Sequence, residues 1–528
     1  MKYALKHDTI NLTRHIAKDI ALIYMRRTNM GALKAAAIFS DNMVLQREKN
    51  ISIWGTGKDG NTVTASINGD SADTLICEGR WQIDLPPMPA GGPYSLTVSD
   101  GTDSITFDNV MIGEVWLAGG QSNMEFEIKD SDGGQELLST LKDVNVRYYY
   151  TPKIAYIDEE FEQKERNSGW SEFSEENAKH WSAVAFHCAK KLSEELDVTI
   201  GIIGCNWGGT SASAWMSREA ILANTATRIY MDEYDEAVSK YTIDEHRKLW
   251  DEYLEYSRVW NEKLGEIYAK NPDTSWDDAL EYAGESKYPG PKSPFNEMRP
   301  TGLYETMISR VCPYTLRGFL FYQGESDDHR PDVYYDLFSN LISEWRNDWD
   351  DEELPFLFVQ LPMFAYENAP DTKHWAKVRE AQLRVYKTVK NTWMALIPEY
   401  GTMDDIHPKV KKPVGDRLAL LALNHVYGMD CKSDAPELDR FYIKGDEIHL
   451  LFRKTYGGLI VKSDRAEGFE ISGDGENFHK ADCSIMGNEI RIKSDKVSRP
   501  KFARYNWTNH GPVTIYNKAG IPLGGFRV

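Results

Sequence analysis

Four compact apolar runs, separated by segments with helical periodicity, most constrain how this chain can fold. They lie at residues 115–118, 199–204, 318–322 and 356–360. Short runs that are apolar on both faces are typical of strands buried in a mostly parallel sheet. A helix is predicted at residues 183–196, just before the second run. The sequence therefore predicts an α/β domain.

The regions on either side of this pattern are different. Residues 37–108 contain alternating runs, such as 51–54 and 62–67, that are interrupted by turn residues. Such alternation predicts antiparallel strands with one buried face, and it returns near the C-terminus. The predicted units are an N-terminal extension (1–36), a β-sandwich-like domain (37–108), the α/β domain (109–433) and a C-terminal β-domain (434–528).

A charged, aromatic-rich segment interrupts the α/β pattern from about residue 217 to 290. Its spacing is helical, and it ends in the loop signal Pro289-Gly290-Pro291. We interpret it as a helical insertion. Two interpretations stay open: a lid over a functional site, or a solvated helical hairpin with no functional role.

Composition excludes several classes of function. The 528-residue chain has 61 Lys and Arg against 81 Asp and Glu, a net charge of -20. This charge works against binding to nucleic-acid phosphates or anionic membrane surfaces. No apolar window is long enough to cross a bilayer. We expect a soluble protein with a small-molecule partner and leave its oligomeric state open.

The six cysteines are scattered, without a Cys-x-x-Cys pair or a Cys/His cluster. The sequence therefore predicts neither a zinc site nor a disulfide framework, and no cofactor or metal is expected. The apolar stretch at residues 20–25 is shorter than a signal-peptide core. These features together predict a cytoplasmic location.

Polar loops follow the first three apolar runs. In an open parallel sheet, ligands bind at the carboxyl ends of the strands. The first loop, Gly119-Gly120-Gln121-Ser122-Asn123-Met124, places a serine on a tight turn that enters a helix. Such a serine can be an exposed nucleophile whose oxyanion is stabilised by the helix N-terminus. Taken alone, the loop favours the simpler interpretation that Ser122 is only a helix cap.

The next two loops add possible partners for this serine. Gly208 and Gly209 let a backbone N–H approach a substrate carbonyl, although a tight structural turn needs the same residues. Gln323 and Glu325 add an amide donor and a carboxylate at another strand end.

A serine nucleophile also needs a base. Among 12 histidines, His407 is best placed, in Asp404-Asp405-Ile406-His407-Pro408 before a predicted helix. An aspartate three residues before a histidine can orient the imidazole through Nδ1. The same spacing also arises by chance or as a capping pair.

Taken together, these motifs make the chain resemble the sialate O-acetylesterase family of SGNH (GDSL-like) hydrolases, which includes acetyl xylan esterases. The similarity spans nearly all of residues 37–528, and there is no Gly-x-Ser-x-Gly elbow. The resemblance implies a flavodoxin-like, three-layer SGNH domain at 109–433. The matching blocks are residues 39–46, 113–116, 120–124, 207–210, 214–216, 322–326, 359–362, 379–382, 405–408 and 520–523.

The resemblance also implies roles for individual residues. Ser122 resembles the nucleophile and His407 the base. For the acid, the resemblance ranks Asp404 first, Glu325 second and Asp405 third. The implied oxyanion and substrate-binding residues are Gln121, Gly208, Gly209 and Gln323.

The expected function is removal of acetyl groups from a mono- or oligosaccharide, of the sialic acid or xylo-oligosaccharide type, through an acetyl-enzyme. One alternative is a non-catalytic carbohydrate-binding protein on a degenerate hydrolase fold. Another is a glycosidase that uses Asp404, Glu325 and Asp327 as paired carboxylates.

Overall fold

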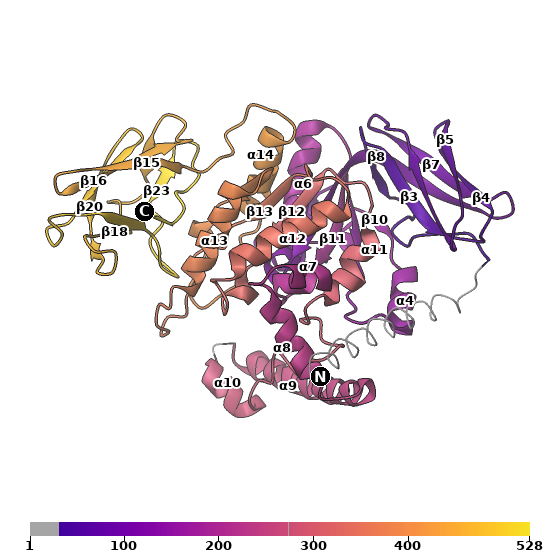
Figure 1. Cartoon of the computed structure of the whole chain (residues 1–528), viewed down its shortest axis with the longest axis horizontal. Helices are drawn as coiled ribbons and strands as arrows, with labels where there is room; N and C mark the ends of the chain where they lie inside the picture. Colours follow the sequence, from indigo (N-terminus) through magenta and orange to yellow (C-terminus); the bar gives the residue numbers. More distant parts are fainter. Residues whose placement is uncertain (1–30, 273) are drawn as a thin grey trace, which may run out of the picture.

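The computed structural model describes residues 31–272 and 274–528 (Figure 1). Most of the N-terminal extension predicted at residues 1–36 therefore lies outside the described residues. From Leu33 onward the chain is already packed, because β1 (Lys34–Ala35) pairs with β3 (Ile51–Thr56).

A sheet of parallel strands forms the centre of the molecule, in the order β9-β11-β8-β12-β13-β14. The antiparallel strand β10 closes one edge. The predicted α/β class is therefore confirmed as a mixed α/β fold. The strands are β8 (Ser104–Gly120), β9 (Val146–Tyr150), β10 (Trp170–Glu172), β11 (Ile200–Asn206), β12 (Gly318–Tyr322), β13 (Phe356–Val359) and β14 (Thr392–Ala395).

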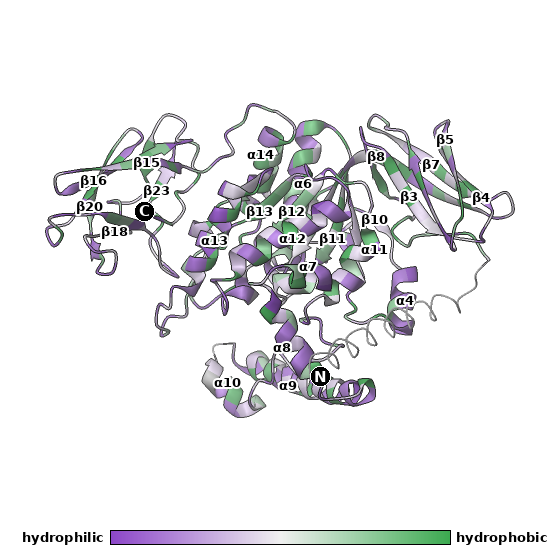
Figure 2. Ribbon diagram, viewed as in Figure 1, coloured by the Kyte–Doolittle hydropathy of each residue, from purple (hydrophilic) through white to green (hydrophobic). Residues whose placement is uncertain are grey.

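The four apolar runs lie in β8, β11, β12 and β13, and Figure 2 shows the hydrophobic character of these central strands. The tyrosine-rich β9 was not among the strands the sequence pattern identified. Its residues Tyr148 and Tyr149 are nonetheless almost fully buried. Tyrosine packs as an aromatic ring while its hydroxyl makes the sequence look polar.

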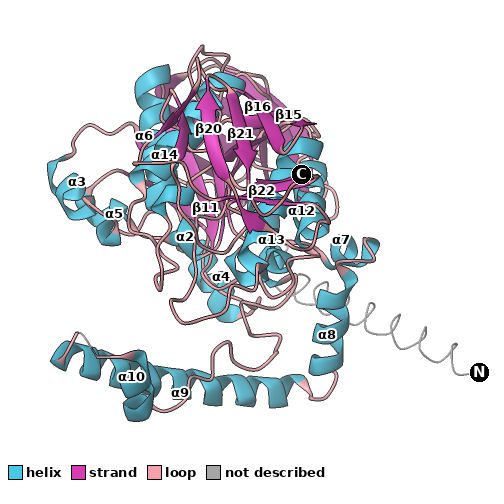
Figure 3. Ribbon diagram, turned by 90° about the vertical axis from the view of Figure 1, so that its left-hand side faces the viewer, coloured by secondary structure: helices cyan, strands magenta, loops and turns pink. Residues whose placement is uncertain are grey.

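Helices cover both faces of the central sheet (Figure 3). On one side α6 (Ala183–Leu196) packs against α14 (Lys412–His425), and on the other lie α12 (Tyr334–Asp348) and α13 (His374–Thr388). The predicted helix 183–196 is confirmed, with Ser182 as its N-cap. Gly415 permits the close crossing of α14 and α6, because a Cβ there would lie 2.6 Å from the Cβ of His187.

Strand β8 links the central sheet to the N-terminal strands. Its first half pairs with β7, and its second half lies between β11 and β12. The predicted boundary at residue 109 falls inside this strand, and the division into domains remains a prediction. The N-terminal strands include β2 (Val44–Gln46), β4 (Thr62–Ile67), β5 (Asp70–Leu75), β6 (Arg80–Leu85) and β7 (Gly91–Ser99).

The helical segment expected at about 217–290 extends as an arm from the sheet domain (Figure 3). Its longest helix, α9, begins with a capping box between Thr242 and Glu245. None of the described helices is long and apolar enough to cross a membrane. The arm consists of α8 (Arg228–Val238), α9 (Ile243–Lys270) and α10 (Trp276–Ala283), and α7 (Arg218–Ala223) precedes it.

The C-terminal strands are antiparallel and enclose a hydrophobic cluster of their own. The buried Arg379 of α13 ties this region to the sheet domain by donating to the backbone carbonyls of Asn506 and Thr508. The strands are β15 (Glu437–Lys444), β16 (Glu447–Arg453), β17 (Leu459–Val461), β18 (Phe469–Ser472), β19 (His479–Lys480), β20 (Asp482–Met486), β21 (Glu489–Lys493), β22 (Phe502–Tyr505), β23 (Ile515–Asn517) and β24 (Phe526–Arg527).

A buried carboxylate on β8 joins this strand to the end of β2 and to the segment before β12. Glu114 is fully buried and accepts hydrogen bonds from Arg47 Nε at 2.6 Å and Arg317 Nε at 2.7 Å. Gln46 Nε2 donates to the same carboxylate at 2.9 Å. Because a buried charge needs paired donors, this cluster of polar side chains is explained by packing.

Replacing Glu114 by alanine is expected to lower the free energy of unfolding by about 3 kcal/mol, because two guanidinium groups would lose their buried partner. Chemical denaturation of the variant measures this loss. Glu176→Ala is the control: its pair with Lys179 is at the surface and its side chain is 83% exposed, so its loss should be barely measurable. Equal losses in the two variants would contradict the prediction.

Candidate active site

The serine predicted as nucleophile lies where β8 turns into α2 (Ser122–Glu125). Gly120 makes this turn possible: its φ is 137°, and a Cβ would lie 2.1 Å from the carbonyl oxygen of Tyr322. The helix cap is Gln121, so the alternative that Ser122 serves only as the N-cap is wrong. The turn leaves the Ser122 hydroxyl available to another partner.

That partner is His407. Its Nε2 lies 2.8 Å from Ser122 Oγ, although the two residues are 285 positions apart in the chain. Burial and the positive charge of Lys411 lower the pKa of His407, and the negative charge of Asp405 opposes them. A lowered pKa keeps the imidazole neutral at neutral pH, which is the form that accepts a proton.

The three candidate acids have other partners in this structure. Asp404 is exposed, and its Oδ1 accepts from the backbone N–H of Glu367 at 2.9 Å. Asp405 Oδ1 accepts from the backbone N–H of His407 itself, also at 2.9 Å. Among the described residues, no hydrogen bond joins His407 Nδ1 to a carboxylate. The assigned acid roles therefore remain predictions.

The third candidate, Glu325, belongs to a buried polar network directly behind the nucleophile. Its Oε1 accepts from Asn123 Nδ2 at 2.6 Å, and the same amide donates to the carbonyl of Ile406 at 2.9 Å. Lys411 Nζ completes the network by donating to Asn123 Oδ1. One side chain thus joins the serine loop, the loop after β12 and the histidine loop.

Burial shifts the pKa values of both charged groups in this network. Burial raises the pKa of Glu325, which hydrogen bonding to Asn123 and the charge of Lys411 oppose. Burial lowers the pKa of Lys411 to about 7, although the Glu325 charge acts in the opposite direction. Neither Asn123 nor Lys411 was identified as a site residue from the sequence. Lys411 lies among other lysines, and a lysine in such a run is ordinarily expected to be solvated. The only signal in the sequence was that Lys411 lies four residues after His407.

The predicted glycine loop lies against the nucleophile. A Cβ on Gly208 would lie 3.3 Å from the Cβ of Ser122. The N–H of Gly208 donates to the carboxylate of Glu125, which also pairs with Lys153. In this structure the Gly208 amide is therefore already engaged. Glu125 was not identified from the sequence, because it looked like an ordinary acidic residue in a first helical turn.

The two glutamine candidates are also engaged in the interior. Gln323 is 1% exposed, and its Nε2 donates to Asp327 Oδ2 at 2.6 Å. Gln121 Oε1 accepts from the backbone N–H of Ser326 at 3.1 Å. Gln323 Nε2 also donates to Gln121 Oε1 at 3.3 Å, so the two amides join the loops after β8 and β12 and help to position the site.

Asp327 is likewise a structural carboxylate. It accepts from Ser211 Oγ at 2.6 Å, from the Ala212 amide at 2.9 Å and from the Tyr230 hydroxyl at 2.9 Å. This fully buried group anchors α8 of the arm. Asp327 is thus committed to internal partners, and Asp404 is exposed on a different loop, so neither carboxylate is free in the way that a glycosidase pair requires.

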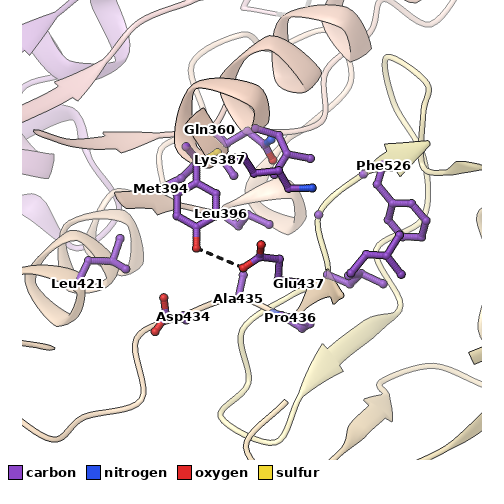
Figure 4. Close-up of a pocket in the computed structure, with 16 residues that line it drawn as sticks. Gln360, Lys387, Met394, Leu396, Leu421, Asp434, Ala435, Pro436, Glu437 and Phe526 are labelled. Carbon is purple, nitrogen blue, oxygen red and sulfur yellow. Dashed lines mark hydrogen bonds between the residues drawn. The ribbon is translucent and has the colours of Figure 1, made fainter. Parts of the chain in front are cut away.

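A separate pocket lies at the seam between the sheet domain and the C-terminal strands (Figure 4). Tyr386 and Glu437 line it, and the tyrosine hydroxyl donates to the carboxylate at 3.4 Å. None of the predicted site residues borders this pocket. Within the described part of the chain, no group of three or more His, Cys, Asp or Glu side chains has the arrangement of a metal site.

Known proteins resemble this chain along most of its length. Residues 292–421 match a family model described as "Carbohydrate esterase, sialic acid-specific acetylesterase". The sialate O-acetylesterase of Mus musculus is 27% identical over 453 residues, which cover 78% of this chain and 77% of the mouse protein. The human sialate O-acetylesterase is 25% identical over 475 residues, covering 83% and 79% of the two chains.

A solved structure agrees with these matches. The crystal structure of a carbohydrate acetylesterase from Xanthomonas citri has a TM-score of 0.75 and 26% sequence identity, and the alignment covers 94% of this chain and 99% of that one. Together, the family model, the curated relatives and the solved structure show that this chain is similar to sialate O-acetylesterases and to a carbohydrate acetylesterase.

Proposed function

We propose that this protein is a carbohydrate O-acetylesterase in which Ser122 is the nucleophile and His407 the general base. The observation that carries the proposal is the 2.8 Å contact between Ser122 Oγ and His407 Nε2 at the carboxyl ends of the parallel strands. The names of the mouse and human relatives and of the Xanthomonas citri enzyme support the acetyl ester as substrate.

The reaction then proceeds in two acyl transfers. Ser122 Oγ attacks the acetyl carbonyl while His407 Nε2 takes its proton. The bond from the carbonyl carbon to the sugar oxygen breaks, and His407 returns the proton to that oxygen. Water, deprotonated by His407, next attacks the acetyl-enzyme and releases acetate. The first N–H groups of α2 are proposed to stabilise the oxyanion, because helix-start amides lack intrahelical partners.

The proposed catalytic fold is the flavodoxin-like, three-layer SGNH domain. With β9 set aside, the parallel strands run β11-β8-β12-β13-β14. In chain order this is 2-1-3-4-5, the flavodoxin-like order, and ligands bind such sheets where the order reverses. Ser122 follows β8, the first strand in that order.

Because His407 Nδ1 has no carboxylate partner among the described residues, we propose Ser122 and His407 as a working pair, with the triad acid unassigned. The substrate is proposed to be an acetylated sugar of the sialic acid or xylo-oligosaccharide type. A cytoplasmic location is likewise a proposal, which fractionation of the source cells would test.

Ser122→Ala is expected to fold normally and to lose 4-nitrophenyl acetate hydrolysis by about 10⁴-fold or more, because the attacking oxygen is gone. Steady-state kinetics measure the loss, and circular dichroism checks the fold. A fluorophosphonate probe should label the wild-type protein at Ser122. Retained turnover in the variant, or an unreactive Ser122, would instead favour the non-catalytic carbohydrate-binding protein.

A mechanism that uses only Ser122 and His407 predicts a modest role for each of the three candidate acids. Asp404→Asn, Asp405→Asn and Glu325→Gln are each expected to lower kcat by less than about 100-fold, whereas loss of a triad aspartate costs about 10⁴-fold. Measuring kcat for the three variants decides between these cases. A loss near 10⁴-fold in one of them, with an unchanged circular dichroism spectrum, would identify that residue as the acid.

The pH dependence follows from the charges around His407. Activity needs the neutral imidazole, so kcat/KM falls as the pH drops through the His407 pKa. Since burial and Lys411 lower that pKa, half-maximal activity is expected below about pH 6.5, the ordinary value. Lys411→Met should move this midpoint up and Asp405→Asn should move it down. Profiles with 4-nitrophenyl acetate measure both, and shifts in the same direction would contradict this electrostatic account.

A further inference from the structure

The loop that returns from the arm ends beside the nucleophile. A Cβ on Gly209 would lie 2.3 Å from the hydroxyl oxygen of Tyr288 and 2.6 Å from Cε of Met298. Its neighbour Gly208 is the residue that borders Ser122. Tyr288 therefore reaches from the arm to the glycine loop of the candidate active site, while the residue as a whole stays 62% exposed.

The same loop forms a pocket with the long arm helix α9. Tyr253 and Tyr256 lie one turn apart on this helix and face Gly290 and Pro291 across the pocket. A Cβ on Gly290 would lie 2.7 Å from the ring of Tyr253, so the loop backbone lies directly on that ring. Lys287 Nζ lies 3.8 Å from the ring centre of Tyr256. Two aromatic side chains of the arm thus lie against the loop that carries Tyr288.

A carboxylate without a partner accompanies these tyrosines. Glu297 makes no ion pair or side-chain hydrogen bond with another residue in the described chain. Burial raises its pKa, and its charge in turn helps burial to raise the pKa of both Tyr253 and Tyr288. Glu297 is half-buried, and a partly buried carboxylate is stabilised by hydrogen-bond donors. Its own backbone N–H is one donor to the Glu297 carboxylate, and the hydroxyl groups of a sugar are donors of the kind that would complete its hydrogen bonding.

Small-molecule sites combine aromatic faces with a few polar groups that set orientation. The faces of sugar rings suit tyrosine, and sugar hydroxyls suit a carboxylate acceptor. Residues 243–297 carry 13 acidic and 7 basic side chains, so this surface repels an anionic sugar such as sialic acid. A neutral glycosyl chain meets no such penalty.

We propose that Tyr253, Tyr256, Tyr288 and Glu297 form a glycosyl-binding platform, and that the enzyme acts on acetylated neutral oligosaccharides that extend from Ser122 along the arm. This inference rests on the proposed esterase function and specifies its substrate class. The platform holds the sugar units beyond the acetylated one, so it contributes to binding of oligosaccharides and adds nothing to binding of a single acetylated sugar.

The test compares three substrates: acetylated xylo-oligosaccharides, an acetylated monosaccharide and 4-nitrophenyl acetate. Tyr288→Ala and Glu297→Gln are each expected to lower kcat/KM for the oligosaccharides about 10-fold, mostly through KM, which corresponds to about 1.4 kcal/mol. The loss should exceed that for the other two substrates at least fivefold. Tyr282→Ala is the matched control, because Tyr282 is an exposed tyrosine on α10 outside the platform. It should leave all three activities unchanged.

Two results would overturn the platform. An equal loss on all three substrates would show that these residues act on the glycine loop and not on the sugar chain. Unchanged oligosaccharide KM in both variants would show that the arm does not bind substrate.

The substrate class has its own test. Preference of the wild-type enzyme for 9-O-acetylated sialic acid over acetylated xylo-oligosaccharides would contradict the neutral substrate class. In each case Ser122-dependent hydrolysis of 4-nitrophenyl acetate would leave the proposed esterase function standing.

Discussion

The close approach of Gly120 to the carbonyl of Tyr322 is the constraint on which the site depends. A side chain at Gly120 would overlap the backbone of β12, so the turn after β8 exists only with glycine there. That turn carries Ser122 out of the sheet at the edge where the histidine loop also arrives. Because β8 is paired on both sides, a shift of the turn would have to disturb the core of the sheet.

Buried polar groups behind the site fix the positions of the loops that surround this turn. Asn123 binds Glu325, Lys411 and the Ile406 carbonyl, and Asp327 binds the start of the arm. Buried polar groups are costly unless they are paired, so each loop has one favourable position. The charged network therefore orients the Ser122–His407 pair, and it also sets the electrostatic environment of the imidazole.

The sequence identified much of this architecture because periodicity reports burial. The four apolar runs became central strands, and the helix predicted at 183–196 has those bounds in the structure. The tyrosine-rich strand β9 was not predicted, since the hydropathy of tyrosine does not indicate that it is buried. For the site, strand-end loops pointed to Ser122 and His407, which lie in contact. The amides of Gln121, Gln323 and Gly208 proved to be engaged with internal partners, which sequence spacing does not reveal.

The sequence by itself determined the α/β class, the antiparallel flanks and the two residues that meet at the candidate active site, because these follow from local periodicity and from glycine-rich turns at strand ends. Only the tertiary structure decided which groups surround that pair. It buried Lys411 and Glu325 behind Asn123, engaged Asp404 with the backbone N–H of Glu367, and brought Tyr288 of the arm against Gly209. Such contacts join segments far apart in the chain, and their formation depends on packing that no local pattern records.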